Sequence, residues 1–397
     1  MKIFFLFITT IVFLFISKFS SAQQMRIGVL TDYDVQRILF SYNDGSYLIY
    51  ADTNEFGAIL PNEFVDISLL ENDKLLLKKG VEILGEFDQI DLIETIPSSS
   101  ITLTTKNPLT KERKYNNDFE ITSGSKVLTI VNLVDMNNYL AGVVESEGGG
   151  GKELEYYKVQ AIMCRTYALK NLSKHKENAY SLCDRTHCQA YHSMLRFTPK
   201  IMDAVKQTEN LILVDDHKDL AGTYFHANCG GQTSLPEDVW NTGLPYLKTF
   251  KDTFCIYTKQ ATWEKRVPQQ KWADFLVSRY NYPLYDSVFG SMIFTFNQPE
   301  RMAFFQSPSL GIPLRDLRQE FQLKSTFFSC YPEGLEIVIR GKGVGHGVGL
   351  CQEGAMKMAK YGYNFQQIAL YYFPGLNLIS YKEYLFFKQR NGKIDEF

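Results

Sequence analysis

Short apolar stretches separated by turn-forming pairs dominate the first hundred residues. Segments such as 46–50 (SYLIY) and 74–78 (KLLLK) have the length of strands, and the Asn-Asp and Asp-Gly pairs between them favour turns. Further on, residues 127–134 (VLTIVNLV) read as a buried strand. The pattern therefore predicts a small β-rich N-terminal unit over residues 23–106, followed by a larger domain over residues 107–380.

The pattern changes from strand to helix after residue 152. Apolar residues recur three and four positions apart, which places them on one face of an α-helix: Leu154, Tyr157, Ala161, Cys164 and Ala168. Later segments predict a helix near Trp272, a strand at 335–339, a glycine loop at 341–349 and a helix at about 352–360. We expect an α+β fold, a β-rich composite domain with a few helices that follows the small β unit and precedes a C-terminal tail at 381–397.

The N-terminus has the pattern of a signal peptide. Lys2 is followed by an apolar run at 3–16 and then by Ser20-Ser21-Ala22, the small-x-small form that signal peptidase cleaves. The alternative is a transmembrane anchor, but the run is shorter than the roughly 20 residues that span a bilayer. We expect residues 1–22 to be removed and the mature chain to lie in the periplasm or outside the cell, with no membrane span.

Charge and cysteine content limit the classes of partner that we expect. The formal net charge of −2 lacks the excess of positive charge that nucleic-acid-binding proteins carry. Aromatic residues make up 14% of the chain, which suits sugar stacking but fits a packed β-rich core better. The seven cysteines are an odd number, so in an oxidising compartment at least one thiol stays unpaired.

An acidic residue stands directly before four glycines. The segment 139–147 (YLAGVVESE) ends at Glu147, and Gly148 to Gly151 follow before the helix begins. Such an acid lies on backbone that a polymer can approach closely, although an acid at this place is more often a helix cap. The residues alone therefore leave both roles open.

Four blocks of the chain resemble the SpoIID/LytB family. Residues 139–147, leading into 158–169 (KVQAIMCRTYAL), look like the family's YL-GVV-SEM and A-QAVAARTYAL segments. Residues 180–191 (YSLCDRTHCQAY) look like YDLCDTTHCQVY. The remaining blocks are similar to the family's CGG, VW, PYL and GRGWGHGVG motifs, and they stand in family order: YFHANCGGQT at 224–233, EDVW at 237–240, PYL at 245–247, GKGVGHGVG at 341–349, QEGA at 352–355 and YFPG at 372–375.

This resemblance implies a peptidoglycan lytic transglycosylase, whose catalytic domain is 107–380. Such an enzyme cleaves the bond between N-acetylmuramic acid and N-acetylglucosamine without adding water and leaves 1,6-anhydro-muramic ends. One acid suffices, because it protonates the leaving oxygen and then takes a proton from the 6-hydroxyl. Alignment with the family's catalytic residue gives Glu147, with Glu145 in reserve. The family's usual Met is replaced here by Gly148, which changes the loop next to the acid.

The resemblance also implies substrate-binding residues. Arg165 matches a functionally important Arg of the family, and its guanidinium could bind the lactyl carboxylate of muramic acid; a structural ion pair is the alternative. His346 in the glycine loop, and His226, are expected to line the groove, or to be hydrogen-bonded structural histidines. Because glycines alternate from 341 to 349, the loop lacks the spacing of a G-x-G-x-x-G nucleotide motif. We expect it to let the backbone approach the glycan.

A cysteine and histidine segment predicts either zinc or a disulfide. His175, Cys183, His187 and Cys188 are the ligand types of a closed tetrahedral zinc site, as some family members have in this region. Adjacent His187 and Cys188 can hardly both face one ion without strain, and a Cys183–Cys188 disulfide is the alternative. We expect no cofactor for catalysis, and zinc in a structural role.

Two other functions remain open. A non-catalytic wall-binding protein or amidase enhancer, with a cell-wall amidase as partner, would use the same groove without chemistry. A thiol hydrolase would use Cys229 with His226 or His346, but no family block assigns a nucleophile there.

Overall fold

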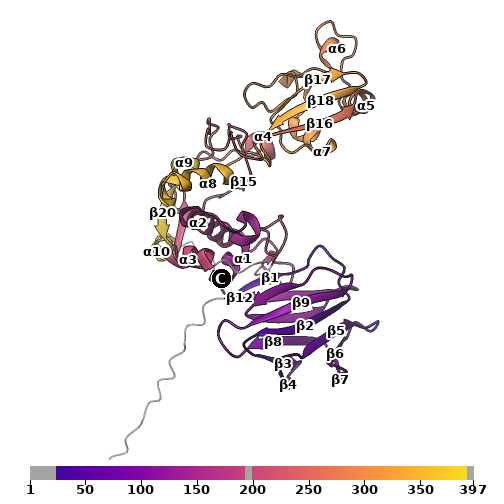
Figure 1. Cartoon of the computed structure of the whole chain (residues 1–397), viewed down its shortest axis with the longest axis vertical. Helices are drawn as coiled ribbons and strands as arrows, with labels where there is room; N and C mark the ends of the chain where they lie inside the picture. Colours follow the sequence, from indigo (N-terminus) through magenta and orange to yellow (C-terminus); the bar gives the residue numbers. More distant parts are fainter. Residues whose placement is uncertain (1–23, 193–198, 391–397) are drawn as a thin grey trace, which may run out of the picture.

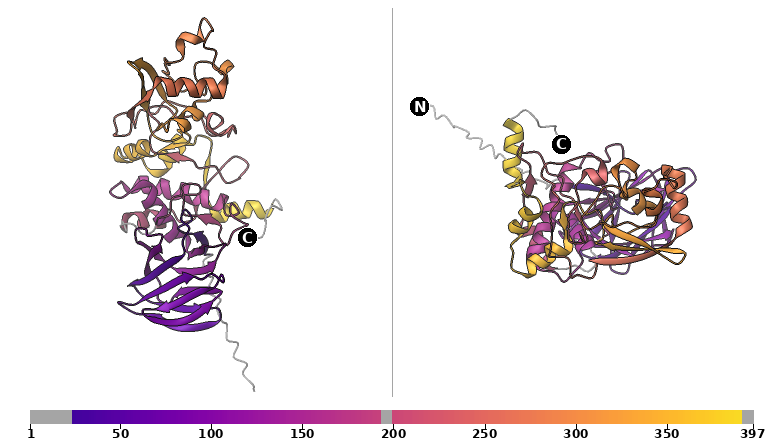
Figure 2. Two further views of the ribbon diagram at one scale, coloured as in Figure 1. Left: turned by 90° about the vertical axis from the view of Figure 1, so that its right-hand side faces the viewer. Right: turned by 90° about the horizontal axis from the view of Figure 1, so that it is seen from above.

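The computed structural model describes residues 24–192 and 199–390, arranged as three parts stacked along the long axis of the molecule (Figures 1 and 2). The predicted signal peptide at 1–22 lies outside the described residues. The α+β, β-rich fold class is confirmed. Within the described part of the chain, no helix combines the length and apolar character needed to cross a membrane.

The first part is a sandwich of two sheets. One sheet has the order β13 (Leu182–Cys183), β1 (Met25–Gly28), β12 (Leu128–Val134), β11 (Asp118–Ser123), β8 (Gln89–Glu94), β3 (Tyr47–Ala51), β4 (Asn54–Ile59). The other has the order β10 (Arg113–Asn116), β9 (Ser100–Asn107), β2 (Arg37–Asp44), β5 (Phe64–Leu69), β6 (Leu75–Lys79), β7 (Glu82–Phe87).

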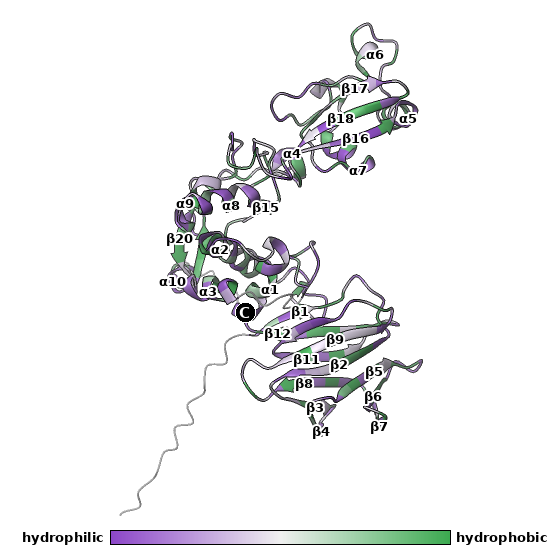
Figure 3. Cartoon of the chain, in the orientation of Figure 1, coloured by the Kyte–Doolittle hydropathy of each residue, from purple (hydrophilic) through white to green (hydrophobic). Residues whose placement is uncertain are grey.

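Alternating apolar residues hold the two sheets together. In β2, Ile38 and Phe40 are fully buried while their neighbours are more exposed, which is the period of a strand with one face in a core. The Phe40 ring lies 5.0 Å from Phe119 of the opposite sheet. In Figure 3 the sandwich strands carry much of the hydrophobic colour.

The sandwich includes strands from both sides of residue 106. Strands β10, β11 and β12 pair with β9, β8 and β1, so the unit extends to Val134, beyond the boundary expected from the sequence. The pairing of β12 with β1 joins segments that are distant in the chain, which local pattern does not reveal. The predicted strand at 127–134 is confirmed as β12.

The middle part is a layer of helices that shares one continuous core with the sandwich. It contains α1 (Met136–Gly148), α2 (Leu154–Lys170), α3 (Pro199–Gln207), α8 (Gln352–Lys360), α9 (Phe365–Tyr372) and α10 (Tyr381–Arg390), with two strand pairs, β14 (Leu211–Val214) with β20 (Asn377–Ser380) and β15 (Phe225–His226) with β19 (Leu350–Cys351). The helices predicted at 152 onward and at 352–360 are confirmed. Part of the expected C-terminal tail is helix α10.

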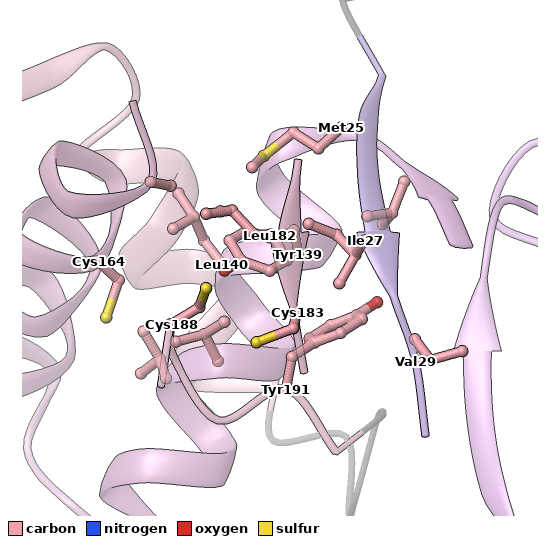
Figure 4. Close-up of a cluster of buried hydrophobic side chains, with 14 of the residues drawn as sticks. Met25, Ile27, Val29, Tyr139, Leu140, Cys164, Leu182, Cys183, Cys188 and Tyr191 are labelled. Atoms are coloured by element: carbon pink, nitrogen blue, oxygen red, sulfur yellow. The ribbon is translucent and has the colours of Figure 1, made fainter. Parts of the chain in front are cut away.

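Helix α2 is the centre of this layer. Its predicted apolar face is buried, but Gln160 and Arg165 are buried too, because α1, α3, α8, α9 and β14 surround the helix. Figure 4 shows the core where α1 and α2 meet the sandwich, with Tyr139, Leu140 and Cys164 on the helical side and Ile27 on β1.

The third part is inserted between β15 and β19 and has its own core. Its sheet has the order β16 (Thr262–Pro268), β18 (Glu336–Lys342), β17 (Phe328–Glu333), with α5 (Gln269–Tyr280), α6 (Phe289–Met292), a 3₁₀ helix (Pro308–Leu310) and α7 (Leu314–Glu320); α4 (Glu237–Trp240) lies near its base. The buried Trp272 of the predicted helix stacks on Phe321 at 4.8 Å. We call residues 261–343 the inserted unit.

Candidate functional site

Helix α1 brings Glu147 to the surface of the helical layer. The helix begins at Asp135, whose side chain accepts hydrogen bonds from the backbone N–H groups of Asn137 and Asn138. It ends because Gly149 adopts a φ of +65° and donates its N–H to the Glu145 carbonyl. Glu147 therefore lies in the last turn, where its side chain projects from a fixed backbone.

The family's usual Met at position 148 has no room in this structure. A Cβ on Gly148 would come within 2.9 Å of the Tyr156 hydroxyl, which is closer than real Cβ contacts come. Tyr156 of α2 is fully buried and occupies that space. The replacement thus fits the packing of α1 on α2 and leaves Glu147 in place.

The Glu147 carboxyl is partly desolvated and held through one oxygen. Burial raises its pKa, and the Ala190 N–H, which donates to Oε1 over 2.9 Å, opposes that shift. Among the described residues no group donates to Oε2, which is therefore the oxygen available to a ligand. A carboxyl with a raised pKa keeps a proton to higher pH than an exposed one, as a general acid requires.

Glu147 lines a cavity of about 480 Å³. Its other lining residues come from the 167–189 segment, from β15 and from the glycine loop: Tyr167, Lys174, Thr186, His187, Cys188, Gln189, Thr223, Tyr224, Phe225, Trp240 and His346. Among these lining residues, all from the described ranges, Glu147 is the only carboxylate. The cavity thus offers one acid, one exposed lysine and several aromatic rings.

One wall of the cavity is aromatic. The rings of Tyr224 and Trp240 lie 4.6 Å apart, and Trp240 lies 5.1 Å from His346. Trp240 is 41% exposed, although large aromatic side chains usually bury more of their surface. Exposed rings that face a polar cavity can stack on the apolar faces of sugars.

The two histidines form the back of this wall. His226 is buried and its Nδ1 lies 3.1 Å from the Val348 carbonyl, while its ring lies 5.5 Å from His346. Burial lowers the pKa of both, that of His346 to about 4. Both imidazoles are therefore neutral near pH 7. His346 lines the cavity as predicted, whereas His226 lies behind it.

The glycine loop packs against the protein itself. Gly349 has a φ of +72°, and a Cβ there would come within 2.2 Å of the Tyr224 carbonyl oxygen; a Cβ on Gly345 would meet His226 at 2.8 Å. The alternating glycines let residues 343–349 lie directly on the segment from Tyr224 onward. Close approach between two segments of this chain therefore accounts for these glycines.

Arg165 does not line the Glu147 cavity; with Asp135 and Glu209 it lines a separate cavity of about 500 Å³. It is 3% exposed and donates to three backbone carbonyls, those of Val205, Thr208 and Leu211, at 2.8 to 3.2 Å. These carbonyls lie at and after the C-terminal end of α3, where helix carbonyls lack helical partners. Arg165 thus ties α2 to α3. The reserve acid Glu145 is 5% exposed and does not line the cavity.

The four predicted metal ligands converge. The ligand atoms of His175, Cys183, His187 and Cys188 lie within 4.8 Å of one another, and Cys188 Sγ is 3.3 Å from His175 Nε2. A tetrahedral zinc ion spaces sulfur and nitrogen ligands roughly 3.5 Å apart, so the donor set fits zinc. His187 and Cys188 face the same point although they are neighbours in sequence, and all the cysteines are thiols. Figure 4 shows Cys183 and Cys188 in this core.

This cluster orders the loop that contacts Glu147. Strand β13 pairs with β1, and the buried Asp184 that follows accepts hydrogen bonds from the backbone N–H of Leu30 and from Arg113. The loop then passes through His187 and Cys188 to Ala190, the donor to Glu147. A metal ion at the cluster would therefore act on the acid by fixing the position of this loop.

Three site residues were not singled out from the sequence. Trp240 was noted only as part of a motif, and an exposed Trp beside a predicted groove was the available signal. Lys174 and Ala190 gave none, because a surface lysine and a backbone N–H have no local sequence signature.

Comparisons with known proteins agree with the motifs. The SpoIID family model, described as stage II sporulation protein, matches residues 124–214, which include Glu147 and the cysteine and histidine cluster. Stage II sporulation protein D of Bacillus subtilis (strain 168) is 28% identical over 268 residues, 62% of this chain and 75% of the relative.

Two further relatives span similar stretches. An uncharacterized protein of Brachyspira hyodysenteriae is 28% identical over 259 residues, covering 64% of this chain and 69% of the relative. An amidase enhancer of Bacillus subtilis is 25% identical over 292 residues, 61% of this chain but 40% of that relative. The resemblance carried by the motifs is confirmed: the chain is similar to the SpoIID/LytB family.

Proposed function

We propose that the protein is an exported lytic transglycosylase that cuts peptidoglycan glycan strands, with Glu147 as both acid and base. The similarity to the SpoIID family and the names of the relatives support a role related to the cell wall. The observation that carries the specific reaction is the lone carboxylate: Glu147 is the only acid among the described residues that line the cavity.

A single acid suits a reaction that consumes no water. The Glu147 carboxyl gives its proton to the oxygen that leaves C1 of muramic acid, and the glycosidic bond breaks. The resulting carboxylate takes the proton of the 6-hydroxyl, whose oxygen bonds to C1 and closes the 1,6-anhydro ring. A hydrolase normally needs a second carboxylate, to activate water or to attack C1.

The rest of the cavity suits a sugar polymer. Tyr224 and Trp240 offer ring faces for stacking, and the exposed Lys174 supplies a cation beside the acid. Lys174 is fixed by hydrogen bonds to the Tyr167 hydroxyl and the His187 carbonyl. We assign to Lys174 the role first expected of Arg165, binding the lactyl carboxylate of muramic acid.

The test compares two isosteric variants. Glu147→Gln keeps the shape and the hydrogen bond from Ala190 but cannot deliver a proton, so cleavage of purified strands should fall by roughly 10²–10⁴-fold. Glu145→Gln, on the same helix and outside the cavity, should keep the wild-type rate when compared per folded molecule. Normal cleavage by Glu147→Gln would contradict the assignment.

The alternative function is enhancement of a cell-wall amidase, which one relative's name suggests. The same cavity would then bind strands without cutting them. Wild-type protein that leaves strands intact but raises the rate of an added amidase would replace the enzyme proposal with this one. In that case Glu147→Gln would have no effect on the enhancement.

A further inference from the structure

A second cluster of metal-ligating side chains lies outside the Glu147 cavity. Cys229, Asp252, Cys255 and Cys351 are all fully buried, and their sulfur and carboxylate oxygen atoms lie within 4.8 Å of one another. We propose that these four side chains form a second zinc site, closed and structural. It joins the segment that follows β15 to strand β19, on either side of the inserted unit.

The distances fit a tetrahedral ion after a small adjustment. Cys229 Sγ lies 3.3 Å from Cys255 Sγ and 3.4 Å from Asp252 Oδ2. Zinc bonds of about 2.3 Å to sulfur and about 2.1 Å to oxygen place neighbouring ligand atoms roughly 3.6 to 3.8 Å apart in a tetrahedron. The ligands need to separate by only a few tenths of an ångström.

Hydrogen-bond donors surround the ligands in the way that anionic ligands require. The backbone N–H groups of Cys229 and Gly354 donate to Cys351 Sγ over 3.3 and 3.4 Å, and the Tyr372 hydroxyl donates to Asp252 Oδ2 over 2.9 Å. Donors of this kind orient metal ligands and stabilise their charge. A Cβ on Gly354 would come within 2.7 Å of Asp252 Oδ2, so the glycine also makes room for the carboxylate.

A zinc ion would balance charge at this site. As zinc ligands, three thiolates and one carboxylate would carry four negative charges, of which a zinc dication neutralises two. Arg301 lies alongside and donates to the carbonyls of Cys229 and Gln232, at 2.7 and 2.6 Å. Without a metal the same buried space would have to hold three thiols and an acid in contact with one another.

The site joins segments that build the cavity wall. Cys351 pairs in register with His226 in the β15–β19 ladder and begins helix α8. Cys229 follows His226 by three residues, and Asp252 and Cys255 lie on the segment that leads into the inserted unit. An ion here would hold His226, and through it the loop of His346, in place.

A disulfide would fit these three cysteines less well than a zinc ion. A Cys229–Cys255 bond would leave Cys351 as a buried thiol, whereas zinc uses all three sulfurs. At 3.3 Å the two sulfur atoms are also well beyond the roughly 2.05 Å of a disulfide.

The test is metal content and position, which do not depend on catalytic activity. Zinc per chain should fall by one ion in Cys255→Ser and stay unchanged in Cys330→Ser, a buried cysteine of the inserted unit outside both clusters. A Cys183→Ala/Cys188→Ala variant should keep the ion at this second site. Crystals of the wild-type protein should show anomalous scattering at the zinc edge between the four side chains.

Two results would overturn the proposal. One is the same zinc content in Cys255→Ser as in wild type, with no anomalous peak among the four residues. The other is a Cys229–Cys255 disulfide, seen as two thiols that resist alkylation in unreduced, unfolded protein. If Cys255→Ser does not fold, Asp252→Asn, which keeps the side-chain shape, can be used instead. In a chelator titration this variant should bind zinc more weakly than wild type does. Unchanged zinc affinity would count against the site.

Discussion

Replacing Arg165 by Met separates a structural role from a substrate-binding role. The Met side chain keeps much of the arginine's apolar length but removes the charge and the three hydrogen bonds to the carbonyls after α3. Hydrogen bonds from charged groups contribute about 1.5–3 kcal/mol each, and buried carbonyls left unpaired add a cost. Because such contributions are not additive, we expect the free energy of unfolding to fall by about 3 to 5 kcal/mol.

Urea unfolding and strand cleavage should be measured on the same variants. Arg165→Met should unfold at a lower urea concentration than wild type but keep the wild-type KM and kcat per folded molecule. The stability of Arg165→Lys should lie between that of wild type and that of Arg165→Met. Lys174→Met is the matched comparison in the cavity: we expect a higher KM with stability changed by no more than about 0.5 kcal/mol. If Arg165→Met kept its stability and lost strand binding, Arg165 would bind substrate and would not be a structural link between α2 and α3.

Three further predictions concern pH, stacking and metal. Because burial raises the pKa of Glu147, whose protonated form is the acid, activity should fall as pH rises through a value above that of an exposed Glu; His346, with a pKa of about 4, should add no change between roughly pH 5 and 7. A falling limb at the ordinary Glu pKa would argue against this. Trp240→Ala should weaken strand binding about tenfold, or ~1.4 kcal/mol, and Trp240→Phe by less, as measured by co-sedimentation with purified strands. Wild-type binding by both variants would show that Trp240 does not stack on the glycan. Cys183→Ala/Cys188→Ala should lose one zinc and, through the loop to Ala190, most of the cleavage activity, whereas a zinc-free wild type with a Cys183–Cys188 bridge would decide for the disulfide.

Elements with strong local periodicity were predictable from the sequence. The helix at 154–170, the strand at 128–134 and the helix at 352–360 are set by apolar spacing within one element, and the structure has all three. The boundary of the sandwich was not predictable, because β12 joins its sheet by pairing with β1, about a hundred residues earlier in the chain. Helix α1 was also missed, although Met136, Tyr139, Leu140, Val143 and Val144 have the spacing of one helical face.

Some site residues were likewise predictable from local motifs, whereas others come together only in the fold. Glu147, His346 and the first cysteine cluster follow from motifs that are short in sequence. Arg165 was assigned to the substrate because a helix position does not reveal that α3 ends against it. The second cluster has no sequence signature, since Cys229 and Cys351 stand 122 residues apart and meet only through the β15–β19 pairing.

The chemistry of the product ends shows whether a single acid cuts the strand without water. Purified glycan strands should be digested with wild-type protein in water enriched in ¹⁸O, and the fragments analysed by mass spectrometry. We expect 1,6-anhydro-muramic ends that contain no ¹⁸O, and no such fragments with Glu147→Gln. Reducing ends that carry ¹⁸O would contradict it, because they require an attacking water and a second carboxylate.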